Sequence, residues 1–180
     1  MPGFLISGSE FGKGNLSEVR RKHRWFFSTL GTTQITTEAL LWLKSATKPE
    51  IEILPLEMHF EQERAWQAGK HQWNDIELVW YDAEQPDISS VVYEWLNETL
   101  NIDRATMATP ATYKRDGQLE HQSSSMKSPD VWRLYNIWPT RVNWDSLDYS
   151  DSNFLEVKVT LKYDRATFKP GNKPGSLLLE

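Results

Sequence analysis

The chain has 180 residues, with 20 Lys and Arg against 25 Asp and Glu for a formal net charge of −5, and it has no cysteine. One domain of this length buries a hydrophobic core, and the lack of cysteine excludes disulfide scaffolds, thiolate metal sites and cysteine nucleophiles. The acidic balance argues against tight, sequence-independent binding to nucleic acid, and no apolar run approaches the roughly 18 residues of a membrane span.

Residues 1–22 are punctuated by glycine and serine and end in the basic cluster Arg20, Arg21 and Lys22. Their first part lacks the charged-then-apolar order of a secretion signal, so we expect a soluble chain in the cytoplasm. We interpret residues 1–22 as an arm that precedes a domain of residues 23–166. The arm is either a solvated terminus or a contact arm whose basic cluster pairs with acidic patches on a neighbouring chain.

From residue 24 onward, apolar side chains recur mostly at every second position, which is the period of a half-buried strand. In 56–61 they alternate with Glu57, His59 and Glu61, so Leu56, Met58 and Phe60 are predicted to share one face. The clearest alternation runs over 155–163. Half-buried strands are typical of antiparallel sheets. Further strands are predicted near 24–30, 39–44, 50–54, 76–80 and 131–138.

One segment follows the helical period instead. Asp87 is suited to cap a helix start, and the apolar residues after it recur at intervals of three and four, ending at Trp95 and Leu96. The spacing predicts one amphipathic helix over about 87–100 whose apolar stripe packs into the core.

Two stretches read as irregular. Residues 101–129 are polar and contain Asp-Gly and a serine run, which predicts a long loop with one short strand near Tyr113. Residues 167–180 have the glycine and proline of a flexible tail and contain three consecutive leucines at 177–179.

The sequence carries no recognisable constellation of catalytic residues. Ser-x-x-Lys occurs twice without its partner motifs, and no phosphate-binding glycine loop is present. His59 between Glu57 and Glu61 is a weak metal signal, and the same carboxylates are a weak glycosidase signal. A solvated acidic face explains them better. We therefore expect no enzyme, no metal and no cofactor.

Nine tryptophans are the most unusual part of the composition. Trp25, Trp80 and Trp95 fall on faces that the patterns assign to burial. The others predict either a carbohydrate-stacking platform or anchors of a protein–protein interface, and composition does not separate the two. These six are Trp42, Trp66, Trp73, Trp132, Trp138 and Trp144.

Three segments follow one another between residues 22 and 166. Segment 54–82 holds two strands and a long connection, and the predicted helix carries an aromatic pair that ends in Trp95. Segment 137–164 holds Trp138-Pro139, an acidic connection and a closing strand that ends in Tyr163-Asp164. In this order and spacing they resemble the tail tube proteins of contractile-tailed bacteriophages, which are related to type VI secretion tube proteins.

The resemblance implies a mainly β fold, in which two packed antiparallel sheets form a barrel or sandwich with one helix. It implies hexameric rings whose sheets join edge to edge and stack into a tail tube. Phage DNA would pass through this tube without tight binding, and contraction of a sheath would drive the tube into the host. The implied partners are further copies of the chain, the sheath, and the baseplate and tail-terminator proteins. The implied location is the virion tail, assembled in the host cytoplasm.

Two alternatives stay open within and beyond this family. The arm and tail exceed the family minimum, which leaves open a tube-initiating baseplate protein or the tube of a related contractile injection system. A carbohydrate-binding β-sandwich that uses surface tryptophans is the alternative from another class.

The resemblance also suggests roles for particular residues. Segment 61–72 corresponds to the loop that reaches the adjacent ring, with Trp66 as its main anchor. Carboxylates in the acidic row either line the lumen, where they repel phosphates weakly, or form salt bridges between rings. The lumen candidates are Glu50, Glu52, Glu57, Glu61, Glu63 and Glu77, and the ring-stacking candidates are Arg64, Trp66, Lys70, His71 and Trp73.

Overall fold

The computed structural model describes residues 21–30, 35–122 and 130–171, so Arg20, the preceding residues of the predicted arm and residues 172–180 of the tail lie outside the described residues. The elements run in this order: β1 (Trp25–Leu30), α1 (Thr37–Leu41), β2 (Leu43–Ala46), β3 (Ile51–Phe60), β4 (Glu63–Trp73), β5 (Ile76–Tyr81), α2 (Ile88–Thr99), β6 (Leu100–Asn101), β7 (Thr106–Met107), α3 (Pro110–Tyr113), β8 (Arg115–His121), β9 (Asp130–Asn143), β10 (Glu156–Lys162) and β11 (Arg165–Lys169).

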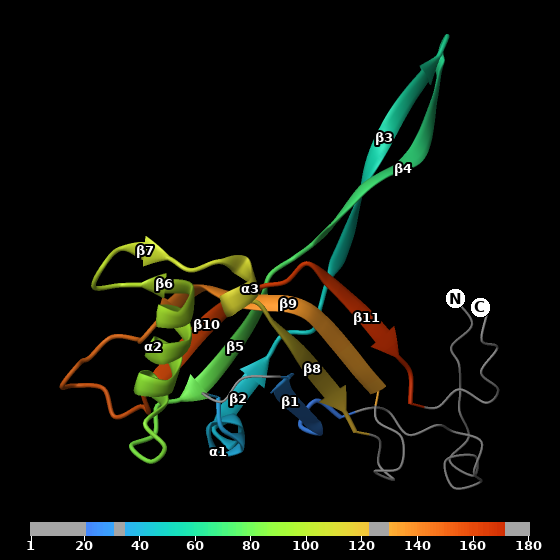
Figure 1. Cartoon of the computed structure of the whole chain (residues 1–180). Helices are drawn as coiled ribbons and strands as arrows, with labels where there is room; N and C mark the ends of the chain where they lie inside the picture. The colour runs from blue at the N-terminus through green and yellow to red at the C-terminus, as the bar shows by residue number, and fades with distance from the viewer. Residues whose placement is uncertain (1–20, 31–34, 123–129, 172–180) are drawn as a thin grey trace, which may run out of the picture.

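The body is an antiparallel sheet of seven strands in the order β1-β8-β9-β10-β5-β2, with β11 paired to β9. The first half of the long strand β9 pairs with β8 and β11, and its second half pairs with β10. One strand therefore belongs to two groups, β1-β8-β9-β11 and β9-β10-β5-β2. Buried side chains from both groups form a single core, which confirms the predicted mainly β fold of antiparallel strands (Figure 1).

The clearest sequence patterns become the centre of this core. Val157, Val159 and Leu161 on β10 are fully buried, as their alternation predicts, although Leu155 at the start of that run is exposed. Each buried aliphatic side chain contributes roughly 1.5–3 kcal/mol relative to its exposure to water. Strand β10 is therefore well specified by its alternation.

Helix α2 covers the core beside β9, and its predicted position is confirmed. The Asp87 side chain accepts a hydrogen bond from the Ser90 backbone N–H at 2.9 Å, which caps the helix start. Ile88, Val92 and Trp95 form the buried stripe. This stripe is part of the core.

The strand predicted at 39–44 is wrong. Residues 37–41 form α1, which is capped by the Thr36 hydroxyl as it accepts from the Ala39 N–H at 3.2 Å, and β2 begins only at Leu43. Ala39 and Leu40 are adjacent and both buried. A strand would place them on opposite faces, whereas a helical turn directs both toward the body.

The long loop predicted for 101–129 is also wrong over most of its described length. It contains β7, α3 and β8, and Tyr113 ends a helix that starts at Pro110 instead of lying in a strand. Strand β8 is polar, yet it lies between β1 and β9. Its backbone groups are paired on both sides, so neighbours define the strand where alternation does not. At the other end, β11 continues to Lys169, three residues past the predicted domain boundary at 166.

Candidate interaction surface

The β3–β4 hairpin projects away from the body (Figure 1). Its two strands pair only with each other among the described elements, from Ile51 opposite Trp73 to Phe60 opposite Glu63. The turn is Glu61-Gln62, and Glu61 has a φ of 49°. The connection predicted at 61–72 is therefore wrong, because most of it is strand β4. An isolated two-stranded hairpin is marginally stable in water, so this one needs further contacts.

Both faces of the hairpin carry exposed apolar side chains. Leu54 and Leu56 lie on one face, and the exposed fraction of Leu56 is 56%. The buried face predicted for Leu56, Met58 and Phe60 is therefore not formed within the chain at Leu56. Ile53 lies on the opposite face, as does Trp66, whose exposed fraction is 62%. Several large apolar side chains exposed on one projecting element are typical of an interaction site.

A close backbone approach shapes the hairpin at Gly69. A Cβ at this position would lie 2.5 Å from the Leu54 carbonyl oxygen and 2.9 Å from Leu56 Cγ. The register of the two strands shifts here, between Ile53 and Pro55. Glycine is the residue that lets the two strands approach at this irregularity.

The predicted ring-stacking residues spread along the whole of β4. Arg64 and Trp66 lie in its outer half, and Lys70 and His71 lie next to the register shift. Trp73 is at the base and half-buried, with its ring 5.8 Å from that of Tyr163. The structure thus places four of the five candidates on the exposed hairpin and uses the fifth to attach the hairpin to the body.

The predicted acidic row divides between faces. Glu57 lies opposite Trp66 in the hairpin. Its carboxylate lies 3.3 Å from the Arg64 guanidinium and 3.9 Å from His59 Nε2. On the other face, Glu52 accepts a hydrogen bond from the Gln72 amide at 3.0 Å, and Glu63 lies opposite Phe60. The remaining candidates are Glu61 in the turn, Glu50 before β3 and Glu77 on β5.

Of the five residues that carry the family resemblance, three belong to the interior, Trp138 is half-buried and Asp164 is exposed. Trp95, Pro139 and Tyr163 are buried, and the ring of Trp138 packs against that of Tyr113 at 5.6 Å between centroids. Asp164 is the polar member of the set. Their positions explain the resemblance as a shared fold, since buried residues determine packing.

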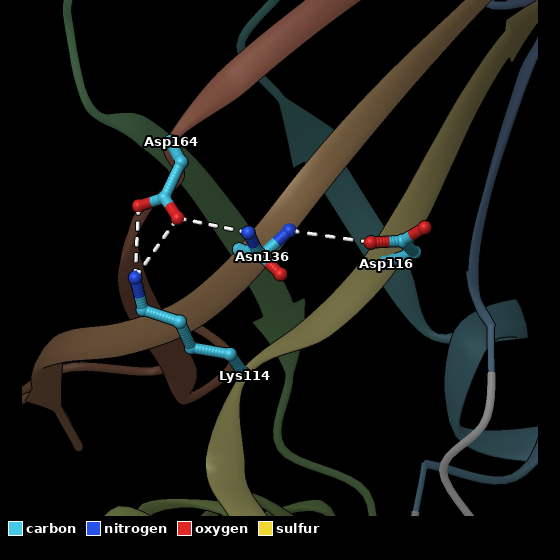
Figure 2. Close-up of polar contacts among 4 residues, drawn as sticks. All are labelled: Lys114, Asp116, Asn136 and Asp164. Atoms are coloured by element: carbon cyan, nitrogen blue, oxygen red, sulfur yellow. Dashed lines mark hydrogen bonds and ion pairs between the residues drawn. The ribbon is translucent and has the colours of Figure 1, made fainter. Parts of the chain in front are cut away.

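Asp164 is the centre of a polar network of four residues that joins three parts of the chain (Figure 2). Lys114 Nζ lies 2.9 Å from both Asp164 carboxylate oxygens, and the Asn136 side-chain amide donates to Asp164 at 2.9 Å. The Asn136 backbone N–H donates to Asp116 at 3.3 Å. Asn136 has a φ of 59° and lies where the register of β9 shifts against β8. The network therefore stabilises the irregular point at which β9 leaves one strand group for the other.

Opposing effects determine the pKa of Asp164. Burial raises it, but the hydrogen bonds from Lys114 and Asn136 and the Lys114 charge together lower the pKa below the ordinary value of 3.8. No sequence signal identified Lys114 or Asn136, because they are 50 and 28 positions from Asp164.

The described end of the arm lies beside β8. Arg21 and Lys22 are exposed, and His121 Nε2 lies 2.9 Å from the Arg21 carbonyl oxygen. A contact role for this segment stays a prediction.

The tryptophans do not form one platform. Among the six predicted surface tryptophans, Trp42, Trp66 and Trp144 are exposed and lie in three separate parts of the chain, the end of α1, strand β4 and the loop after β9, while the other three are half-buried. Trp80 and Trp95 are buried as predicted, whereas Trp25 is half-buried.

The described residues bring together no group of three metal-ligating side chains, and none of the described helices is long and apolar enough to cross a membrane.

Comparisons with known proteins give similarity in structure alone. No protein-family model matches the chain, and no curated protein matches it in sequence. A chain in the cryo-EM structure of the anti-feeding prophage baseplate matches with a TM-score of 0.68 and 13% identity, over 88% of this chain and 100% of that one. A chain in the structure of the anti-feeding prophage cap, a tube terminating cap, matches with a TM-score of 0.66 and 18% identity, over 86% and 93%.

A third similar chain comes from the PVC sheath-tube complex of an extracellular contractile injection system in its extended state. Its TM-score is 0.60 with 16% identity, over 92% of this chain and 99% of that one. The chain thus has the fold of chains found in the tube, cap and baseplate assemblies of contractile injection systems.

Proposed function

We propose that this chain is a structural subunit of the tube of a contractile injection system and acts by assembly, without catalysis. The observation that carries the proposal is the β3–β4 hairpin, which exposes apolar side chains on both faces in a chain with the fold of such assemblies. In this proposal, copies form six-membered rings, and the hairpin of each copy docks on the adjacent ring.

The exposed apolar surface of the hairpin is large enough to drive stacking. Five of its side chains are between 43% and 62% exposed: Ile51, Ile53, Leu54, Leu56 and Trp66. Because full burial of an aliphatic side chain contributes roughly 1.5–3 kcal/mol, covering the exposed part of the four aliphatic side chains would stabilise one contact by about 4–5 kcal/mol, before the contribution of Trp66 is added. A ring makes this contact once per subunit, so stacking becomes strongly cooperative.

Open sheet edges supply the contacts within a ring. Among the described strands, β1 pairs only with β8, and β2 only with β5. An unpaired edge binds other strands unless it is covered. Edge-to-edge pairing between copies would cover these edges, and a head-to-tail contact that closes by rotation produces a ring.

In its most specific form, the proposal is that the chain forms the inner tail tube of a contractile phage, with a sheath around the tube and DNA passing through it. In this assignment some or all of the candidate glutamates face the lumen, where they weakly repel phosphates and keep DNA from binding. The second candidate is a tube cap or a tube-initiating baseplate protein. It is supported by TM-scores of 0.66 and 0.68 to chains of a cap and a baseplate, against 0.60 for the sheath-tube complex.

Negative-stain electron microscopy of the purified chain tests the proposal. A tube subunit forms rings with a central hole and stacks of such rings, whereas a cap or initiator forms single rings. A chain that stays monomeric at millimolar concentration, in low and in high salt, would contradict both. A reconstruction that places all six candidate glutamates on the outer wall would remove the lumen assignment alone.

A further inference from the structure

A second exposed apolar segment lies far from the hairpin, in the loop 144–155 that joins β9 to β10. Leu147 and Phe154 have exposed fractions of 87% and 82%, and Tyr149 is fully exposed. The loop also contains Asp145, Asp148 and Asp151 and no basic residue. It combines apolar side chains with three negative charges.

Hydrogen bonds within the loop hold it in shape. Asp148 accepts from the Ser150 backbone N–H at 2.8 Å and from its hydroxyl at 2.7 Å, and these two bonds lower the pKa of Asp148. Asp151 accepts from the Asn153 N–H at 3.0 Å. The Phe154 ring meets that of Tyr81 edge-on at 6.1 Å between centroids. Such a preorganised loop loses little conformational entropy when it binds.

A groove of complementary chemistry opens between the two edges of the seven-stranded sheet. Its volume is about 680 Å³. Its apolar surface comes from Trp25 on β1, Leu119 on β8, Trp132 on β9 and Ala46 on β2. Leu119 is buried and the two tryptophans are half-buried, so the rings form partly open walls.

The charged side chains of this groove are all basic. They are Arg21, Lys22, Lys44 and Lys48, and no Asp or Glu is among the described residues that line it. Lys44 already contacts Glu156, while Lys22 and Lys48 are exposed beside the arm and β2. The groove therefore suits an occupant that carries both aromatic or aliphatic side chains and carboxylates.

We infer that the loop 144–155 of one copy docks in this groove of a neighbouring copy, with an aromatic side chain between the tryptophans and its aspartates facing the lysines. This inference rests on the proposed self-assembly and names one of its contacts. In Figure 1 the loop extends beyond α2 at the left, while β1 and β2 lie at the bottom of the molecule. Because the loop and the groove are different parts of the surface, the contact is head-to-tail and leaves each copy able to bind the next.

Site-specific crosslinking tests the contact. Because the chain has no native cysteine, only the introduced cysteines react with the crosslinker. The variant Tyr149→Cys/Lys48→Cys, treated with a short bismaleimide, is expected to form a covalent ladder that ends at the ring size. Equal mixtures of the two single variants should give dimers only. The matched control Tyr149→Cys/Arg104→Cys carries its second cysteine on the exposed β6–β7 turn and should give no ladder.

The outcomes separate this inference from the proposed function. If the wild type forms rings by microscopy but the double variant gives no ladder, or crosslinks only within one chain, the inference is wrong and the proposed assembly stands. If the ladder forms without rings or tubes, the contact stands and the proposed tube does not. A chain that neither crosslinks nor assembles overturns both.

Charge changes give a second, independent readout by sedimentation. Asp148→Asn/Asp151→Asn retains acceptor oxygens for the loop hydrogen bonds and removes two charges, and should weaken association about tenfold at low salt. The difference from the wild type should shrink in 0.5 M NaCl, because salt screens exposed charges. Lys22→Glu/Lys48→Glu should weaken association further, and adding Asp148→Lys/Asp151→Lys to it should restore part of the loss. Association that none of these charge changes affects would overturn the inference.

Discussion

Trp66→Ala separates assembly from folding most directly. Trp66 lies in the outer half of β4 and has an exposed fraction of 62%. If a tryptophan side chain has a surface of roughly 250 Å², about 150 Å² of the Trp66 surface is exposed in the isolated chain and is available for a contact. At about 25 cal/mol per Å², covering that surface contributes up to about 4 kcal/mol to each contact.

The same substitution removes less from the isolated chain. The part of Trp66 that the chain itself covers, about 100 Å², corresponds to at most about 2.5 kcal/mol, and less when residual structure in the unfolded state is counted. We therefore expect Trp66→Ala to stay folded, with a melting temperature lowered by a few degrees. Because each contact loses more free energy than the isolated chain does and a ring repeats the contact, tubes should be absent at the concentration at which the wild type polymerises.

Circular dichroism and negative-stain microscopy of the same samples make the measurement. Trp42→Ala is the matched control, because Trp42 is 43% exposed but ends α1 on the body. Because the chain covers more of Trp42 than of Trp66, this control should cost at least as much folding stability and leave tubes intact. Normal tubes from Trp66→Ala at the wild-type critical concentration would refute the reasoning, as would equal loss of tubes in the control.

Three further substitutions test other parts of the structure. Leu161→Ala opens a cavity at a fully buried position and should lower the free energy of unfolding by about 2–5 kcal/mol in a urea titration, whereas a smaller loss would mean that the core collapses around the gap. Asp164→Asn weakens the bond to Lys114 and should destabilise the fold by about 1 kcal/mol at pH 7. Because the folded-state pKa of Asp164 is lowered, the stability that its carboxylate contributes is present above about pH 4 and is lost as the pH falls through the folded pKa. Wild type and variant should therefore have the same stability in acid. A difference that persists at pH 2 would contradict that origin. Gly69→Ala forces a Cβ to within 2.5 Å of the Leu54 carbonyl oxygen and should abolish tubes with little change in the melting temperature of the body; unchanged polymerisation would show that the hairpin geometry is not needed.

The amino-acid sequence by itself predicts the elements whose side chains face the core. Strand β10 and helix α2 were placed correctly because burial on one side imposes a period of two on a strand and of 3.6 on a helix. Their apolar residues satisfy that period within the chain. The absence of a recognisable catalytic constellation was likewise read from the sequence.

Where burial does not impose a period, the sequence is ambiguous and only the tertiary structure decides. Strand β4 has no usable alternation, because neither face of the hairpin is covered within the chain, so its strand character comes from backbone pairing with β3. Polar β8 is defined by its two neighbours in the same way.

Contacts between distant residues are the other part that the sequence leaves undetermined. Lys114, Asn136 and Asp164 meet only after β8, β9 and the β10–β11 turn have been brought together. The basic groove likewise combines residues from the arm, β1, β2, β8 and β9. The periodicity of a segment indicates which of its residues are buried. It does not indicate which distant residues contact them, because those contacts depend on the fold as a whole.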